Sequence, residues 1–123
     1  MQWKFTGSRP VYQQIMEQFR GAVLTGKFPP GSRIPSVRDL AVEAKVNPNT
    51  MQRALAELER EQLLVCHGTA GRCVTAEAAV LEALRKDAVN LLVRDCARKF
   101  RDAGVSMEQA AALLLAYEET EAG

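Results

Sequence analysis

The sequence predicts a mainly α-helical protein with one small β-hairpin, divided into a domain over residues 1–75 and a helical segment over residues 76–123. Apolar residues recur at helical spacing through most of the chain. Two short runs of β-type residues flank a glycine-containing link near the middle, which is the pattern of a hairpin. From residue 76 onward the composition is helical.

The composition is that of a globular chain of about one domain. Apolar residues make up 47% of its 123 residues, enough for a packed core. No apolar run approaches about 18 residues and no charged-then-apolar leader opens the chain, so we expect neither a membrane span nor a signal peptide. Three cysteines without dense spacing favour the reducing cytoplasm over a secreted disulfide scaffold.

The net charge of +1 hides an asymmetry between the two parts. Residues 1–75 hold ten Lys and Arg against six Asp and Glu, whereas residues 76–123 hold six against nine. A basic surplus attracts phosphate, so the first part is the one suited to a nucleic acid.

The first helix is expected to begin at Pro10, a favourable first helical residue, and to end at Gly26. Before it, Trp3 and Phe5 alternate with polar residues, as in an extended segment that packs on the body. After it, the pair of prolines at residues 29–30 prevents the helix from continuing and predicts a turn.

Two short helices with a tight turn between them follow. Ser36 is expected to cap the first, where Asp39 also places a favourable charge. After the turn, Asn47 is expected to cap the second, with Pro48 at its first position.

The helix that begins at Pro48 has two distinct faces. Four apolar residues lie in one stripe at about 100° per residue: Met51, Ala54, Leu55 and Leu58. The opposite side carries Asn49, Gln52, Arg53, Ala56 and Arg60. Amide and guanidinium groups therefore occupy the start of the helix, where they can pair with base edges, while carboxylates gather at its end.

Residues 63–66 and 71–75 are the two β-type runs, joined by His67-Gly68-Thr69-Ala70. Two helices with a tight turn followed by a hairpin make a winged helix-turn-helix, in which one helix enters the DNA major groove. From such a wing, His67 and Arg72 can reach a phosphate or the minor groove. Ser36 can bind phosphate as well as cap its helix, because a helix N-terminus attracts phosphate.

The helical segment carries a long apolar stripe: Leu81, Leu84, Ala88, Leu92, Cys96 and Phe100. Gly104 ends this helix, and a capping box at Ser106 and Gln109 opens a last one with Leu114 on its apolar side. Packing against the chain's own body is one explanation of the stripe. We favour a two-fold homodimer, because a protruding helix pair has little body of its own to cover it.

Residues 11–75 resemble the DNA-binding domain of GntR-type bacterial transcription regulators. The resemblance lies in a Pro-Ser-x-Arg-x-Leu-Ala helix at residues 35–41, Val-Asn-x-Asn-Thr at 46–50 and Leu-x-x-Glu-x-Leu after it. The remaining 48 or so residues are far fewer than most effector-binding domains of that family contain. In this respect the chain is similar to the YtrA-like subfamily, which ends in two helices that serve chiefly for dimerisation.

The resemblance implies roles for matching positions. Arg38 matches a family arginine that contacts DNA. Recognition-helix contacts fall at Asn47, Asn49, Thr50, Gln52 and Arg53, and the minor groove is approached at Gly68 to Arg72. One departure is that the family's Gly-Thr-Phe-Val at the end of the wing reads Gly71-Arg72-Cys73-Val74 here.

Other chemistries have less support. Cys66, His67 and Cys73 could form a thiol pair or part of a metal site, but they offer three ligands at most and a structural zinc site normally needs four. The only histidine has no nearby serine to activate, and no glycine-rich phosphate loop is present, so we expect no enzyme. We also expect no cofactor and no metal.

The sequence thus predicts a cytoplasmic, sequence-specific transcription regulator that binds a double-stranded DNA operator as a homodimer. A repressor is favoured, and the subfamily resemblance implies targets that include a transporter operon. A small-molecule effector either binds between the C-terminal helices or at their junction with the winged domain, or does not exist. The alternative is a winged-helix module for protein–protein assembly without DNA binding.

Overall fold

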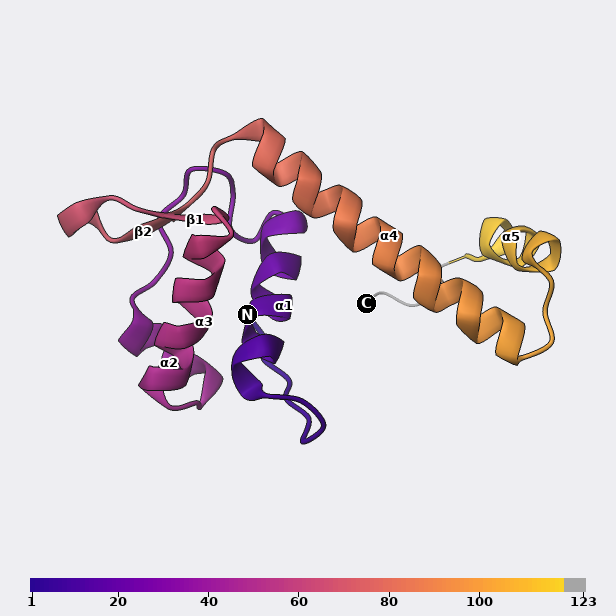
Figure 1. Ribbon diagram of the computed structural model, residues 1–123, viewed down its shortest axis with the longest axis horizontal. Coiled ribbons are helices and arrows are strands. Elements are labelled where there is room, and N and C mark those ends of the chain that lie inside the picture. The colour runs from indigo at the N-terminus through magenta and orange to yellow at the C-terminus, as the bar shows by residue number, and fades with distance from the viewer. Residues whose placement is uncertain (119–123) are drawn as a thin grey trace. The chain divides into compact units, whose positions relative to one another are not determined.

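The computed structural model describes residues 1–118, so residues 119–123 of the predicted helical segment lie outside the described part. Its elements, in chain order, are α1 (Val11–Leu24), α2 (Val37–Ala44), α3 (Pro48–Arg60), β1 (Leu64–Cys66), the 3₁₀ turn η1 (Gly68–Ala70), β2 (Arg72–Val74), α4 (Ala78–Asp102) and α5 (Met107–Ala116) (Figure 1). The predicted fold class, mainly α with a small hairpin, is confirmed. Among the described residues no helix is both long enough and apolar enough to cross a bilayer.

The chain forms two compact units, Met1–Arg85 and Lys86–Gly123, with the division inside α4. The boundary at residue 75 stays a prediction. The first turns of α4 belong to the first unit, where Leu81 and Leu84 pack on its core.

The core of the first unit is built by α1, α2 and α3. The apolar stripe of α3 is fully buried as predicted, with Met51 and Leu55 at 0% exposure. Phe19 of α1 is equally buried and stacks on Phe28 with ring centroids 4.8 Å apart. Burying this stripe turns the opposite side of α3 outward.

Local capping explains where α2 and α3 begin. The Ser36 hydroxyl accepts a hydrogen bond from the Asp39 backbone N–H at 3.1 Å. The Asn47 Oδ1 accepts one from the Asn49 N–H at 2.7 Å, and Pro48 follows as the first helical residue. Both predicted caps are confirmed. Pro10, in contrast, lies at the N-cap of α1, one residue before the helix.

The hairpin is wider than the sequence indicates. Beside β2, Arg33 forms an isolated antiparallel bridge with Cys73. The Ile34 N–H donates to the Arg72 carbonyl at 3.0 Å, and the Val74 N–H donates to the Ser32 carbonyl at 2.8 Å. The segment before α2 therefore acts as a short third strand, which the sequence analysis did not predict.

The extended N-terminal segment is held on α1 by two glutamine side chains. Gln14, only 3% exposed, accepts from the Thr6 N–H and donates to the Thr6 and Arg9 carbonyls. Gln18 accepts from the Lys4 N–H and donates to the Lys4 carbonyl. These side chains satisfy backbone groups as a neighbouring strand would.

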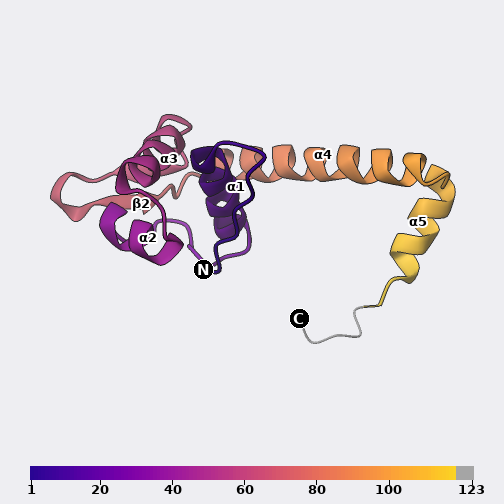
Figure 2. The same cartoon turned by 90° about the horizontal axis from the view of Figure 1, so that it is seen from below.

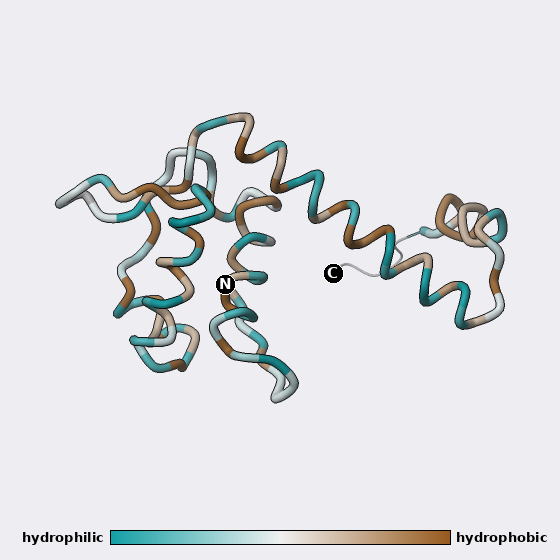
Figure 3. Tube along the Cα trace, in the orientation of Figure 1, coloured by the Kyte–Doolittle hydropathy of each residue, from teal (hydrophilic) through white to brown (hydrophobic). Residues whose placement is uncertain are grey.

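The second unit holds the remainder of α4 and α5. Gly104, with a φ of +78°, lies in the turn that follows α4. The predicted Ser106–Gln109 capping box is present at the start of α5. Figure 2 shows α5 leaving the axis of α4 at a sharp angle. Apolar residues recur along α4, as the brown segments of Figure 3 show, and several of them are exposed. Within the described part of α5, Ala110 is the one buried residue.

Candidate nucleic-acid interface

The outward side of α3 carries the predicted recognition residues. Asn49, Gln52 and Arg53 are exposed, and Thr50 is half-buried. They occupy the first two turns of the helix, ahead of the acidic residues near its end. A rigid helix thus presents amide and guanidinium groups to solvent, with the capping residue Asn47 directly before them.

Arg53 is fixed by a residue that the sequence analysis did not single out. Its guanidinium carbon lies 3.8 Å from the ring centroid of Tyr12 on α1. Tyr12 itself is partly buried and packs on the core. A cation over an aromatic face is attracted by the ring's negative face, so Tyr12 orders the Arg53 side chain.

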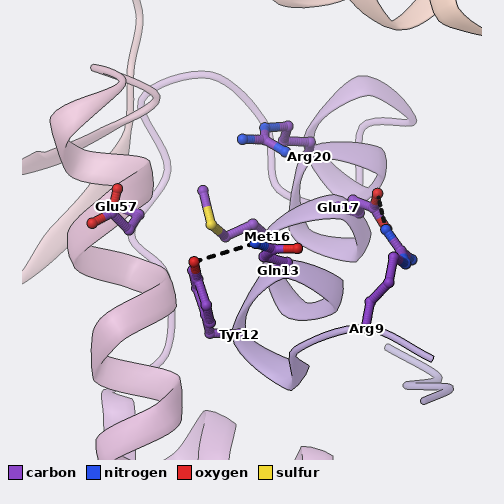
Figure 4. Close-up of a pocket in the computed structure, with 7 residues that line it drawn as sticks. All are labelled: Arg9, Tyr12, Gln13, Met16, Glu17, Arg20 and Glu57. Atoms are coloured by element: carbon purple, nitrogen blue, oxygen red, sulfur yellow. Dashed lines mark hydrogen bonds and ion pairs between the residues drawn. The ribbon is translucent and has the colours of Figure 1, made fainter. Parts of the chain in front are cut away.

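Tyr12 also borders an open hollow of about 300 Å³ between α1 and α3 (Figure 4). The two arginines that line this hollow are ion-paired: Arg9 with Glu17 and Arg20 with Glu61, each at 2.6 Å. The hydrogen bond from Arg9 lowers the pKa of the Glu17 carboxylate, while burial opposes the shift. The hollow is therefore lined largely by satisfied charges.

The N-terminus of α2 adds two of the predicted residues. Ser36 uses an oxygen lone pair for its cap, which leaves the hydroxyl proton free to donate. Arg38 is exposed and forms no ion pair within residues 1–118. Both functions of Ser36 are thus geometrically compatible.

The wing residues differ in their exposure and in their contacts with α3. His67 is exposed, and Gly68 has a φ of +58°, which suits the tight turn of η1. Arg72 is half-buried, and its Nε donates to the Glu59 carboxylate of α3 at 2.8 Å. This ion pair fastens the hairpin to α3.

The register of the hairpin separates the two wing cysteines. Cys66 pairs with Arg72, and Cys73 pairs with Val65. Paired residues share a face and neighbours alternate, so the two thiols point to opposite faces. This geometry argues against the thiol pair that the sequence left open. All three cysteines are free, and residues 1–118 contain no cluster of three or more potential metal ligands.

The residues predicted for dimerisation fall into two groups. Leu81 and Leu84 pack on the core of the first unit. In the second unit, Leu92 is 67% exposed and Leu114 57% exposed, while Ala88, Cys96 and Phe100 are half-buried. Only the first group is packed on that core.

Three residues of this surface escaped the sequence analysis: Tyr12, Arg33 and Glu59. In the sequence, Tyr12 is one member of the apolar pattern of α1, and it is separated from Arg53 by 41 positions along the chain. Arg33 joins the wing through a bridge to Cys73 that is equally remote in sequence. Such long-range pairs leave no local periodicity.

Comparisons with known proteins agree with this geometry. A family model described as "Bacterial regulatory proteins, gntR family" matches residues 11–74. The chain is 28% identical over 106 residues to the uncharacterized HTH-type transcriptional regulator YhcF of Bacillus subtilis, covering 86% of this chain and 88% of YhcF. It is 46% identical over 57 residues to the HTH-type transcriptional repressor YtrA of the same organism, covering 46% of this chain and 44% of YtrA. A solved GntR family transcriptional regulator from Listeria monocytogenes superposes with a TM-score of 0.84 at 31% identity, over 93% of this chain and all of that one.

Proposed function

Because the chain belongs to the gntR family of bacterial regulatory proteins, which are DNA-binding transcription regulators rather than enzymes, we propose that it is a homodimeric repressor of a pseudo-palindromic operator. The observation that carries this proposal is the exposed polar start of α3, backed by a fully buried apolar stripe. It acts in the cytoplasm, where its DNA is found.

DNA recognition is assigned to three parts of the first unit. The start of α3 reads base edges in the major groove, the N-terminus of α2 contacts the backbone, and the wing approaches the minor groove. The proposed contacts are nine residues of the sequence analysis: Ser36, Arg38, Asn47, Asn49, Thr50, Gln52, Arg53, His67 and Gly68. The tenth residue of that set, Arg72, is bound to Glu59 and holds the wing on α3 instead.

The second unit supports the homodimer. Large apolar side chains there are exposed on both helices, among them Leu91, Leu92 and Val93 of α4 and Leu113 to Leu115 of α5. Exposed apolar surface of this extent in so small a unit favours a covered interface. A two-fold axis would present two copies of α3 about one DNA turn apart.

Repression is supported by the similarity to a protein named as a repressor, YtrA. An operator that overlaps a promoter would let the bound dimer exclude RNA polymerase. The subfamily resemblance supports a transporter operon among the targets.

The experiment starts from a pool of random duplexes. Fragments retained by the purified protein are sequenced, which yields the operator, its half-site spacing and its symmetry together. Affinity for the selected site and for random DNA is then followed as salt is raised. Steep weakening on both supports the proposal, because phosphate contacts release counterions. Salt-independent or absent binding to every duplex would favour the protein–protein assembly module instead.

A further inference from the structure

Arg33 lies on the wing although it precedes α2 in the chain. Its backbone forms the bridge to Cys73, and the bonds of Ser32 and Ile34 to β2 fix it on both sides. Its side chain runs beside Gly71: a Cβ built at Gly71 would lie 3.5 Å from the Arg33 Nε and 3.8 Å from Nη2. The guanidinium therefore rests against the backbone just before β2, beside the turn of the wing.

The two faces of the hairpin separate Arg33 from Arg72. Leu64 and Val74 pair on the face that covers the core, and Arg72 shares that face. Arg33 pairs with Cys73 and so lies on the outer face. Arg72 accordingly reaches Glu59 of α3, whereas Arg33 reaches solvent.

We propose that Arg33, an exposed guanidinium laid along the outer face of the wing, supplies the wing's contact with a DNA phosphate, while Arg72 fastens the wing to α3. This inference rests on the proposed function and names a residue that the sequence analysis did not assign to the interface.

The difference in ion pairing between Arg33 and Arg72 supports this division. The Arg72 charge is neutralised by Glu59 at 2.8 Å and is half-buried. Arg33 is exposed and forms no ion pair within residues 1–118. An uncompensated guanidinium is the group that phosphate attracts most strongly, through bidentate hydrogen bonds.

The ordered backbone lowers the cost of such a contact. Arg33 is held by a bridge and by hydrogen bonds on either side, so binding would restrict only its side chain. Gly71, with φ of +82°, carries no side chain that would keep a phosphate away from the guanidinium.

The test compares three substitutions in the full chain on the selected operator and on random duplex. Arg33→Met removes the charge and keeps the stem, and Arg33→Lys keeps the charge. Arg60→Met is the matched control, since Arg60, at the end of α3, is bound to Glu57. Thermal unfolding of each variant is recorded beside the binding curves.

Arg33→Met should lower the slope of log affinity against log salt by about 1, equally on both duplexes. Its loss of affinity should then be roughly threefold greater at about 50 mM than at about 200 mM salt. Arg33→Lys should retain the wild-type slope, as should Arg60→Met.

Three results would overturn the inference while leaving the proposed function intact. The first is a wild-type slope in Arg33→Met. The second is a loss in Arg33→Lys as large as in Arg33→Met, which would make packing rather than charge the property that matters. A loss confined to the operator would equally reject phosphate contact, because it would mean base reading. If the wild type shows no salt-dependent binding at all, the proposed function itself fails.

Discussion

Gln52 projects from the exposed side of α3, one turn after the helix begins. We expect Gln52→Ala to weaken operator binding by about 1–3 kcal/mol, because a side-chain amide can bond two atoms of one base. Binding to random duplex should stay close to wild type. Competition titrations with both duplexes measure the difference, and equal losses on the two would reassign Gln52 to the backbone.

Tyr12 and Arg53 offer a second test at the scale of single side chains. Tyr12→Leu removes the ring that orders the Arg53 guanidinium, and we expect a twofold to fivefold loss of operator affinity, which is about 0.5–1 kcal/mol. Tyr12→Phe keeps the ring and should bind as wild type. An equal loss in both variants would show that the stacking does not matter and that the hydroxyl does.

At this scale the sequence predicted which residues of α3 face outward but not what holds them. The 100° periodicity separates Met51 from Gln52 because burial of the apolar stripe decides the rotation of the helix. The partners of Arg53 and Arg72, which are Tyr12 and Glu59, come from other elements and are set by packing. No spacing in the chain encodes them.

The start of α3 is the element on which recognition depends, and Asn47 serves it in two ways. Asn47→Ala should lower the free energy of unfolding by about 1 kcal/mol, because the Asn49 N–H loses its acceptor. Asn47→Asp keeps an acceptor and suits the helix N-terminus, so its stability should match wild type.

The same pair of variants separates capping from DNA contact. The added carboxylate of Asn47→Asp should repel phosphate. The variant should therefore bind DNA more weakly than wild type while keeping the same free energy of unfolding. Denaturant melts and anisotropy titrations give the two readings. Wild-type DNA affinity in Asn47→Asp would mean that Asn47 is a cap and nothing more.

Helices were easier to predict than the wing. Capping residues and apolar periodicity are local, and they placed the starts of α2, α3 and α5 correctly. The third strand-like segment around Arg33 was missed, because its bridge to Cys73 joins residues 40 positions apart. The face of the hairpin on which each cysteine lies also depends on register, which the residue types did not specify.

At the scale of the whole molecule, dimerisation is better tested at Leu92 than at Leu84. Leu92→Asp places a charge on a side chain that is 67% exposed in one copy, so it should dissociate the dimer without unfolding the unit. Operator binding should fall with it. Sedimentation velocity at micromolar concentration measures the change, and an intact dimer would refute the assignment.

The control for this variant is Asn90→Asp, which adds a similar charge about half a turn away on α4. It should leave the dimer intact. Leu84→Asp is a poor substitute, since Leu84 packs on the core of the first unit and a buried charge there would destabilise the fold itself.

The apolar stripe of α4 shows how far sequence reasoning reaches at this scale. It predicted a long helix with one apolar side, and α4 runs from Ala78 to Asp102. It did not predict that Leu81 and Leu84 would be used by the first unit. A stripe has the same period whether its own chain or a second copy covers it, so pattern alone does not divide it between the two.

The glutamine side chains that hold the N-terminal segment give the protein a native reporter of motion. The Lys4 and Thr6 amides belong to no sheet, yet each donates to a side chain of α1, at 2.9 and 2.8 Å. In deuterated solvent these two protons should exchange far more slowly than those of their neighbours. Their acceptors are side chains of α1. A change in this protection on adding DNA would therefore reveal whether α1 shifts when the duplex is bound, without a label on the chain.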